Sequence, residues 1–151
     1  MKDLQLRQID TKLRSLAKLR TLPVPPKGWI HDIRGALGMS LSQLGGRLKM
    51  SHSAISQLER GEVEGSITLK TLQKVAAGLH CELVYALLPV TSLGEYREQE
   101  ARRVATETID RVGHTMVLEN QAVSAAERSL QIEDLTQELL RERPREIWNA
   151  S

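Results

Sequence analysis

Residues 40–61, SLSQLGGRLKMSHSAISQLERG, predict two short helices joined by a tight turn. Leu44 and Leu48 recur at helical spacing in the first helix, and Ile55 and Leu58 can point inward from the second. These four side chains can hold the two helices together through apolar contact, which leaves the opposite face of the second helix polar. A short polar helix on a small apolar scaffold is how many proteins enter the DNA major groove.

The ends and outer faces of these helices suit contact with DNA. Ser40 can cap the first helix, Ser51 or Ser53 can begin the second, and Gly61 can end it. A capping hydroxyl and the helix amides beside it also suit a phosphate. The predicted DNA-binding residues are Ser40, Ser51, His52, Ser53, Ser56 and Gln57, with Arg34, Arg47, Lys49 and Arg60 as phosphate contacts. Gln57 can offer a donor and an acceptor together to adenine.

Helices are also predicted around this motif, so the expected fold class is all-α. Residues 1–28 combine an amphipathic helix over 3–20 with a stiff linker, TLPVPPKG, whose prolines exclude helix. Residues 29–79 form the bundle, with further helices from Trp29 to Leu37 and from Ser66 or Thr68 to near Gly78. The sequence leaves open whether the first 20 residues pack on the bundle, on a second copy or on another protein.

Residues 80–91 change in character. CELVYALL at 81–88 favours a short strand that Pro89 closes. A lone strand has no partner in a helical chain, so it predicts pairing with the same strand of a second copy and hence a homodimer. A fifth helix that continues the bundle through Leu87 and Leu88 is the alternative.

Helix-forming residues dominate the C-terminal region, 92–151. We expect one helix from Glu95 to about Val112, an interruption at Gly113, and a second helix from Thr115 to about Glu142. Pro144 prevents a clean continuation.

Charge divides the chain unevenly. Residues 1–80 carry 13 Lys/Arg and 6 Asp/Glu, or +7, whereas residues 81–151 carry 8 and 13, or −5, which together give the net +2. A basic half suits a phosphate backbone, and an acidic half suits a protein partner. Solvated helix faces that happen to differ in sign would give the same counts.

Other bulk properties exclude several classes of protein. No run of about 18 apolar residues predicts a membrane span, and MKDLQLRQID lacks the apolar region of a signal peptide. Cys81 is the only cysteine, so we expect no internal disulfide, no metal and no cofactor. No Ser/His/Asp set or phosphate-binding glycine loop is recognisable, so we expect no enzyme. These properties predict a cytoplasmic protein.

The motif and its neighbours resemble the helix-turn-helix family of Cro and lambda repressor, often called XRE-like. The resemblance covers residues 29–79 and rests on Ser40, Leu44, Ser51, Ile55, Ser56, Leu58, Glu59 and Gly61. It implies a lambda-repressor-like bundle in which His52, Ser53 and Gln57 read bases. Glu59 is expected to hold its helix end by an ion pair or a cap. Three residues depart from the family pattern: Leu41 after the cap, Gly45 at the helix crossing, and Lys49 in the turn.

A second motif, TMVLEN at 115–120, resembles the inhibitory helix of antitoxins that block Fic-domain AMP-transferases. The segments GWIHDIRGALGMS, ITLKTLQKVAAGL, CELVYALLP and TMVLENQ together resemble the family named mobile mystery protein A, whose members are encoded beside a Fic-domain protein. The resemblance implies that Thr115, Glu119 and Asn120 form an inhibitory motif, with Glu119 on an active-site arginine of the Fic protein. The alternative is an ordinary amphipathic helix with Thr115 as a cap and Glu119 solvated.

These features together predict an antitoxin that binds operator DNA as a dimer, represses transcription, and inhibits a Fic-domain toxin at its ATP site. A plain dimeric regulator with no inhibitory role is one alternative. A non-DNA-binding inhibitor that uses the bundle as a scaffold is another. The operator sequence, the target of the partner and the stoichiometry of the complex are not predicted.

Overall fold

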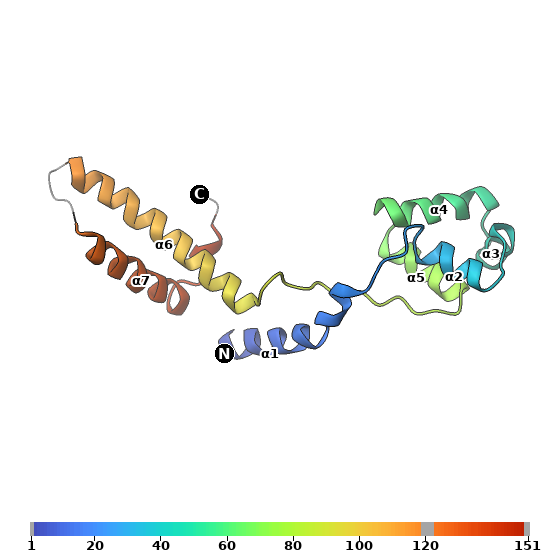
Figure 1. The fold of residues 1–151 in the computed structure, drawn as a ribbon, viewed down its shortest axis with the longest axis horizontal. Helices are drawn as coiled ribbons and strands as arrows, with labels where there is room; N and C mark the ends of the chain where they lie inside the picture. Colours follow the sequence, from blue (N-terminus) through green and yellow to red (C-terminus); the bar gives the residue numbers. More distant parts are fainter. Residues whose placement is uncertain (1, 119–122, 150–151) are drawn as a thin grey trace. The chain divides into compact units, whose positions relative to one another are not determined.

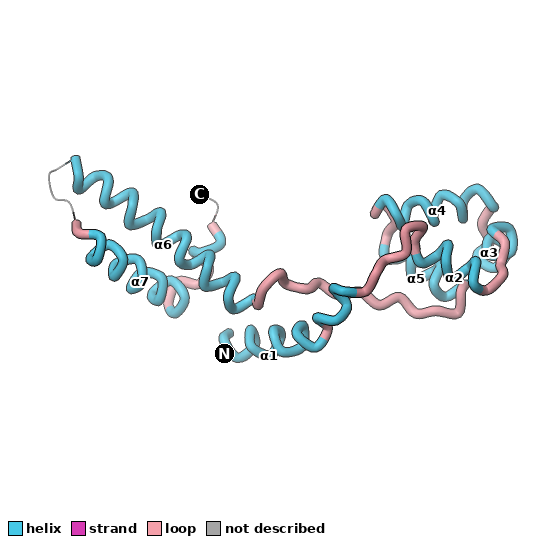
Figure 2. The backbone as a smooth tube through the Cα atoms, viewed as in Figure 1, coloured by secondary structure: helices cyan, strands magenta, loops and turns pink. Residues whose placement is uncertain are grey.

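The computed structural model describes residues 2–118 and 123–149, with the backbone alone for residues 2 and 116–118. The chain divides into two compact units. One spans Lys18–Leu87, and the other combines the residues up to Ala17 with those from Leu88 onward. Within the described ranges every regular element is a helix (Figures 1 and 2). The all-α prediction is confirmed for these residues.

The unit at Lys18–Leu87 contains four α-helices, α2 (Trp29–Ala36), α3 (Leu41–Leu48), α4 (His52–Glu64) and α5 (Leu69–Gly78). The 3-10 helix η1 (Ala17–Thr21) precedes them. Apolar residues at helical spacing meet in one core, whose buried members are Ile30, Leu44, Leu48, Ile55, Val75 and Leu79. Leu44 and Ile55 are fully buried, so the predicted contact between the two helices of the motif is confirmed.

Side-chain caps begin three of these helices. The hydroxyls of Ser40, Ser51 and Thr68 accept hydrogen bonds from the third residue of α3, α4 and α5, respectively. The predicted end of α4 at Gly61 is wrong by a turn. The helix continues to Glu64 and ends at Gly65, because Gly65 (φ 73°) has the left-handed conformation that closes a helix. Gly61 is buried inside the helix instead, where an added Cβ would lie 3.2 Å from Ser66 Oγ.

Two departures from the helix-turn-helix pattern have a structural account. Lys49 closes α3 in the left-handed conformation (φ 57°, ψ 45°), which glycine adopts at lower cost. Gly45 is buried where α3 meets the turn, and a Cβ there would lie 2.5 Å from the Met50 carbonyl oxygen. The turn in this chain therefore approaches α3 too closely for the alanine that the family prefers.

The second unit is a helical hairpin with an added N-terminal helix. Its elements are α1 (Lys2–Ser15), α6 (Leu93–Leu118), α7 (Ala125–Arg141) and the 3-10 helix η2 (Glu146–Trp148). The buried members of its core are Ala101, Ala105, Ile132, Leu139 and Ile147, with Thr136. The two alanines allow α6 and α7 to pack closely, and the buried Thr136 hydroxyl donates to the Ile132 carbonyl at 2.6 Å.

Asp10 joins α1 to the hairpin. Its two carboxylate oxygens accept hydrogen bonds from the Leu93 and Gly94 amides at 2.8 and 3.0 Å, at the start of α6. Arg97 of α6 also forms an ion pair with Asp3. The N-terminal helix, whose role the sequence left open, therefore packs with the C-terminal hairpin.

Two predicted elements are wrong. Residues 81–90 form neither a strand nor a fifth helix, because a strand requires a hydrogen-bonded neighbour and no described segment of the chain supplies one. The predicted interruption at Gly113 is also absent, since α6 runs through this residue to Leu118. The next helix, α7, begins at Ala125. Ser124 caps it in a capping box, in which the Glu127 amide donates to Ser124 Oγ and the Ser124 amide donates to the Glu127 carboxylate.

Candidate nucleic-acid interface

The outer face of α4 presents polar side chains without internal partners. His52, Ser53 and Gln57 are exposed, and Ser56 is half-buried. None of these four side chains forms a hydrogen bond or ion pair with another described residue. Short hydroxyls, an imidazole and an amide offer both donors and acceptors, which is the chemistry that base edges require. These predicted residues therefore lie together on one accessible face.

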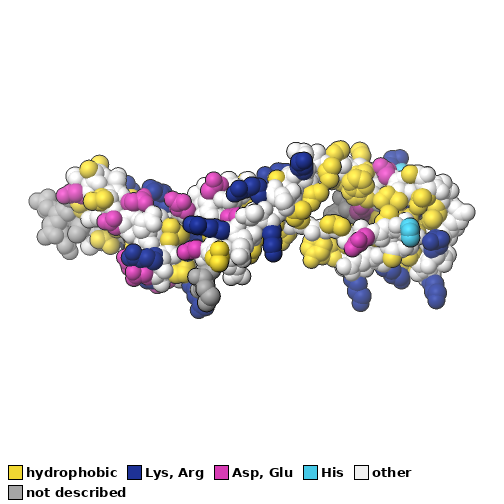
Figure 3. All heavy atoms as spheres, turned by 90° about the horizontal axis from the view of Figure 1, so that it is seen from below, with side chains coloured by type: hydrophobic (Ala, Val, Ile, Leu, Met, Phe, Trp, Pro, Cys, Tyr) yellow, Lys and Arg dark blue, Asp and Glu magenta, His cyan; other side chains and the backbone are white. Residues whose placement is uncertain are grey.

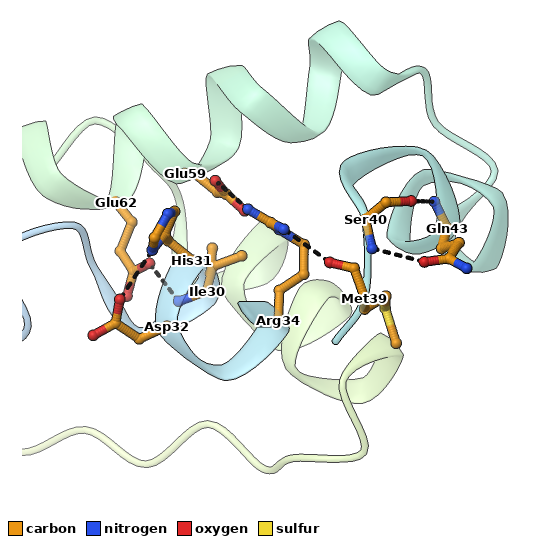
Figure 4. Close-up of polar contacts among 9 residues, drawn as sticks. All are labelled: Ile30, His31, Asp32, Arg34, Met39, Ser40, Gln43, Glu59 and Glu62. Carbon is orange, nitrogen blue, oxygen red and sulfur yellow. Dashed lines mark hydrogen bonds and ion pairs between the residues drawn. The ribbon is translucent and has the colours of Figure 1, made fainter. Parts of the chain in front are cut away.

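The inner face of α4 is fixed by an ion pair as well as by Ile55. Arg34 of α2 donates from Nε to Glu59 Oε1 at 2.6 Å, and from Nη2 to Glu59 Oε2 at 3.3 Å. The remaining terminal nitrogen of Arg34 donates to the Met39 carbonyl at 2.8 Å (Figure 4). The side chains of Arg34 and Glu59 are only 13% and 12% exposed. Of the two roles expected for Glu59, an ion pair or a cap, the structure shows the ion pair. All three nitrogens of the Arg34 guanidinium donate within the domain, to Glu59 and to the Met39 carbonyl.

Glu62 of α4 caps the start of α2. Its carboxylate oxygens accept hydrogen bonds from the Trp29 and Ile30 amides, each at 2.9 Å. Gly28 makes this approach possible, because it has φ 84° and a Cβ there would lie 2.6 Å from Glu62 Oε2. Glu59 and Glu62 thus tie successive turns of α4 to α2, so the orientation of the outer face of α4 is set by its inner face.

Ser40 and Gln43 form a reciprocal cap that the sequence analysis missed. The Gln43 amide donates to Ser40 Oγ at 3.1 Å, and the Ser40 amide donates to Gln43 Oε1 at 2.7 Å (Figure 4). The spacing Ser-x-x-Gln is the signal that would have identified it. Because its oxygen is used in the cap, the exposed Gln43 side chain keeps an NH₂ group that can donate outward.

The remaining predicted cations differ in their surroundings. Lys49 and Arg60 are exposed and have no hydrogen-bond or ion-pair partner among the described residues. Arg47 donates from Nε to the Gly78 carbonyl at 2.9 Å, which leaves its other nitrogens unused. Arg47, Lys49 and Lys74 line an open hollow of about 630 Å³ where α3 and α5 end. Helix C-termini favour cations, which accounts for this cluster without a bound anion.

The second motif can be described only in part. Thr115 is exposed near the end of α6, and its hydroxyl donates to the Arg111 carbonyl at 3.3 Å. Glu119 and Asn120 lie outside the described residues. Over residues 2–118 and 123–149, no three His, Cys, Asp or Glu side chains come close enough to hold a metal ion. None of the helices in these ranges has the length and hydropathy needed to span a bilayer.

The unit that contains α4 is basic. Residues 18–87 carry 9 Lys/Arg and 5 Asp/Glu, a net charge of +4, and the remaining residues carry 12 and 14, a net charge of −2. Lysine and arginine side chains project from this unit on the face shown in Figure 3. A basic unit that presents a polar helix has the charge and the shape expected of a DNA-binding module.

One of three comparisons with known proteins, that with protein-family models, agrees with this geometry. No curated protein and no solved structure matches the chain. Residues 30–85 match a protein-family model described as helix-turn-helix, a family of DNA-binding regulators rather than enzymes. The match begins inside α2 and includes α3, α4 and α5. Residues 30–85 therefore match a helix-turn-helix domain of the XRE family, which supports a DNA-binding transcription regulator.

Proposed function

We propose that the chain is a repressor that reads operator DNA with α4 in the major groove. His52, Ser53 and Gln57 contact base edges, and Ser56 lies closer to the scaffold. The observation that carries this proposal is the contrast between the two faces of α4. Its inner side chains are held by α2 and the core, while its outer polar side chains have no partner among the described residues.

Phosphate contacts would flank this helix. Ser40 and Ser51 begin α3 and α4, where amides and hydroxyls gather, and the Gln43 NH₂ group can donate beside Ser40. Lys49 and Arg60 have no ion-pair partner among the described residues, so their charges are available to phosphates. Arg47 donates to the Gly78 carbonyl from Nε and can donate to a phosphate from its two terminal nitrogens. These contacts set the register of α4 on the duplex and carry no sequence information themselves.

Selection of a binding sequence from random DNA, followed by gel-shift titration, tests the proposal. The double variant His52→Ala/Gln57→Ala should bind the selected sequence roughly 30-fold more weakly or worse, because it removes two base contacts and each good one contributes about 1–3 kcal/mol. Its affinity for unrelated DNA should change much less. Gln73→Ala/His114→Ala, which removes the same two residue types from exposed positions elsewhere, is the matched control. Equal affinity of the two double variants for the selected sequence would refute the assignment of α4.

A separate variant addresses the phosphate contacts. Lys49→Ala should weaken binding to all sequences alike, and should reduce the slope of log K against log salt by about one. A loss restricted to the selected sequence would instead assign Lys49 to base recognition.

A second candidate function is inhibition of a Fic-domain partner by Glu119. It rests on the motif at 115–120 and on the family resemblance, and the exposed position of Thr115 is compatible with it. The test is co-expression with a Fic-domain protein encoded next to this chain. Glu119→Gln should restore AMP transfer by the partner while the complex still forms, and Glu98→Gln on α6 should leave the partner inhibited. If the partner stays inhibited with Glu119→Gln, the inhibitory role assigned to Glu119 is wrong.

A further inference from the structure

The segment that precedes α2 is basic and contains no acidic residue. Between Asp10 and Asp32 the sequence has five lysines and arginines and no aspartate or glutamate. Two of the five, Lys12 and Arg14, lie in the last turn of α1, where the helix dipole favours a positive charge. The other three belong to the same compact unit as α4. They lie within residues 18–28, here called the basic connector, and are Lys18, Arg20 and Lys27.

Two ammonium groups of the basic connector have no internal partner. The Lys18 and Lys27 side chains are exposed and form no hydrogen bond or ion pair with another described residue. The hairpin unit differs, because its Arg97, Arg102 and Arg128 each donate to a carboxylate of the same unit. The acidic residues of the helix-turn-helix unit all follow the connector in the sequence. The positive charge of the connector is therefore available to an anion outside the protein.

The backbone of the basic connector is restricted before any partner binds. In η1 the Thr21 hydroxyl donates to the Lys18 carbonyl at 2.9 Å. The loop that follows contains three prolines, each of which fixes a backbone φ angle (Figures 1 and 2). The Gly28 amide then donates to the Pro25 carbonyl at 2.9 Å, in the turn that contains Lys27. A restricted segment loses less conformational entropy on binding, which favours association with an extended partner.

Lys27 lies next to the contact that joins α2 to α4. It precedes Gly28, whose φ of 84° allows the backbone to pass close to the Glu62 carboxylate. That carboxylate accepts hydrogen bonds from the first two amides of α2, each at 2.9 Å. Glu62 is in the C-terminal half of α4, whereas His52 is at its start. Because a recognition helix reads bases with its N-terminal residues, we expect its C-terminal half, and Lys27 with it, to face phosphates at the edge of the groove.

We propose that the basic connector binds the phosphate backbone of double-stranded DNA beside the base pairs that α4 reads, through the ammonium groups of Lys18 and Lys27. The inference rests on the proposed reading of DNA by α4, and it adds contacts outside the family match, which begins at residue 30. A duplex carries one negative charge per about 1.7 Å of its axis, so binding at α4 brings many phosphates to the same unit. These contacts increase the affinity for all duplexes alike, because they release counterions and read no base.

The salt dependence of binding to an unrelated duplex, measured with the full chain, tests the inference. Lys18→Gln/Lys27→Gln should reduce the slope of log K against log salt by about 1.8, because each lost phosphate contact contributes about 0.9. A rise in salt from about 50 to about 200 mM should then weaken binding of the wild type roughly tenfold more than binding of the variant. Both lysines lack internal partners, so the variant should unfold at the temperature of the wild type.

Arg111→Gln/Arg145→Gln is the matched control. It removes two exposed side chains of the hairpin unit that also have no hydrogen-bond or ion-pair partner among the described residues. The two double variants have the same net charge, but the control should change the slope by less than about 0.5. Equal slopes of the two variants would mean that net charge alone sets the salt dependence. That result, or an unchanged slope in Lys18→Gln/Lys27→Gln, overturns the inference.

The length of the duplex gives a second readout. Trimming the selected duplex to the base pairs that all selected sequences share should weaken binding of the wild type and of the control variant. Lys18→Gln/Lys27→Gln should lose less affinity, because it no longer contacts the removed phosphates. If it loses as much as the wild type, other residues bind those phosphates and the inference is wrong. If His52→Ala/Gln57→Ala instead binds like its own control, the assignment of α4 fails while the phosphate contacts of the connector stand.

Discussion

The two units fix the start of a helix in the same way but differ in their cores and ion pairs. In each unit a carboxylate from one helix caps the start of another: Glu62 caps α2, and Asp10 caps α6. The helix-turn-helix unit has large aliphatic residues in its core and keeps the Arg34–Glu59 ion pair largely out of solvent. The hairpin unit has two alanines and a threonine in its core beside Ile132, Leu139 and Ile147, and most of its ion pairs are exposed.

The two units also differ in how their charged side chains are paired. Two exposed ion pairs, Arg102–Glu133 and Arg128–Asp110, join α6 to α7. Other arginines of this unit that form ion pairs are Arg97, Arg103, Arg141 and Arg143. On the helix-turn-helix unit, Lys49 and Arg60 remain unpaired among the described residues. Several carboxylates of the acidic half of the sequence are therefore engaged in ion pairs within the hairpin unit.

The largest expected effect is on the buried ion pair. Glu59→Gln should destabilise the helix-turn-helix unit by about 3 kcal/mol, because it leaves the Arg34 guanidinium buried without its counter-charge. Glu133→Gln, which breaks the exposed pair with Arg102, should have no resolvable effect on the hairpin unit. Each unit contains one tryptophan, so urea unfolding of Trp148→Phe and Trp29→Phe backgrounds reports the two units separately. Equal effects would contradict the distinction between the two kinds of pair.

The shared capping device should show a smaller effect. Asp10→Ala should destabilise the hairpin unit by about 1–2 kcal/mol, the usual contribution of a cap at a helix start. Hydrogen exchange should then become faster in α1 and in the first turn of α6. Asp10→Asn keeps one acceptor oxygen and should fall between wild type and Asp10→Ala. Protection of α1 that is unchanged in Asp10→Ala would mean that apolar contacts alone hold this helix.

The turn of the DNA-binding motif allows a stabilising substitution. Lys49→Gly should stabilise the helix-turn-helix unit by about 1 kcal/mol, because glycine adopts the left-handed conformation without a Cβ clash. Gly65→Ala makes the reverse change at φ 73°, where no atom lies within 4 Å of an added Cβ, and should destabilise by a similar amount. Thermal unfolding of both variants gives the comparison. The two shifts should have opposite signs.

The smallest expected effect is the loss of stability of the hairpin unit at low pH. The hydrogen bond and charge of Arg97 lower the pKa of Asp3 below 3.8, and hydrogen bonds from the Ser124 amide and hydroxyl lower the pKa of Glu127 below 4.5. Because these folded-state pKa values are lowered, the carboxylates stabilise the hairpin unit above about pH 4.5 and lose this contribution as the pH falls through the folded values. The urea midpoint reported by Trp148 should therefore decline on acidification. Glu127→Gln should flatten that decline.

Local sequence signals predicted the helix-turn-helix unit well. The spacing of Leu44, Leu48 and Ile55 was sufficient to predict the core contact between α3 and α4, and Ser40 was sufficient to predict the start of α3. For the start of α4, the sequence narrowed the cap to Ser51 or Ser53, and the structure shows Ser51. The charge of Arg34 did not reveal its partner Glu59, which lies 25 residues away. Sequence composition indicates a basic surface. Which of the basic side chains form internal hydrogen bonds or ion pairs depends on the fold.

The predictions that failed depend on tertiary contacts. A strand at 81–88 had favourable side chains but no neighbour in the chain. Gly113 costs a helix only about 1 kcal/mol, which the packing of a 26-residue helix can outweigh. The contact of α1 with α6 joins Asp10 to Leu93 across 83 residues, and no local pattern signals such a pairing.

That contact has a consequence for the order in which the protein matures. The helix-turn-helix unit is one continuous stretch, so it can fold as soon as α5 has left the ribosome. In the sequence, the helix-turn-helix unit separates α1 from the rest of the hairpin unit. The Asp10 carboxylate of α1 can therefore accept its hydrogen bonds only after the start of α6 has been synthesised. Closing that long loop is less costly once the intervening residues are already compact. We therefore expect the helix-turn-helix unit to fold before α1 packs against α6.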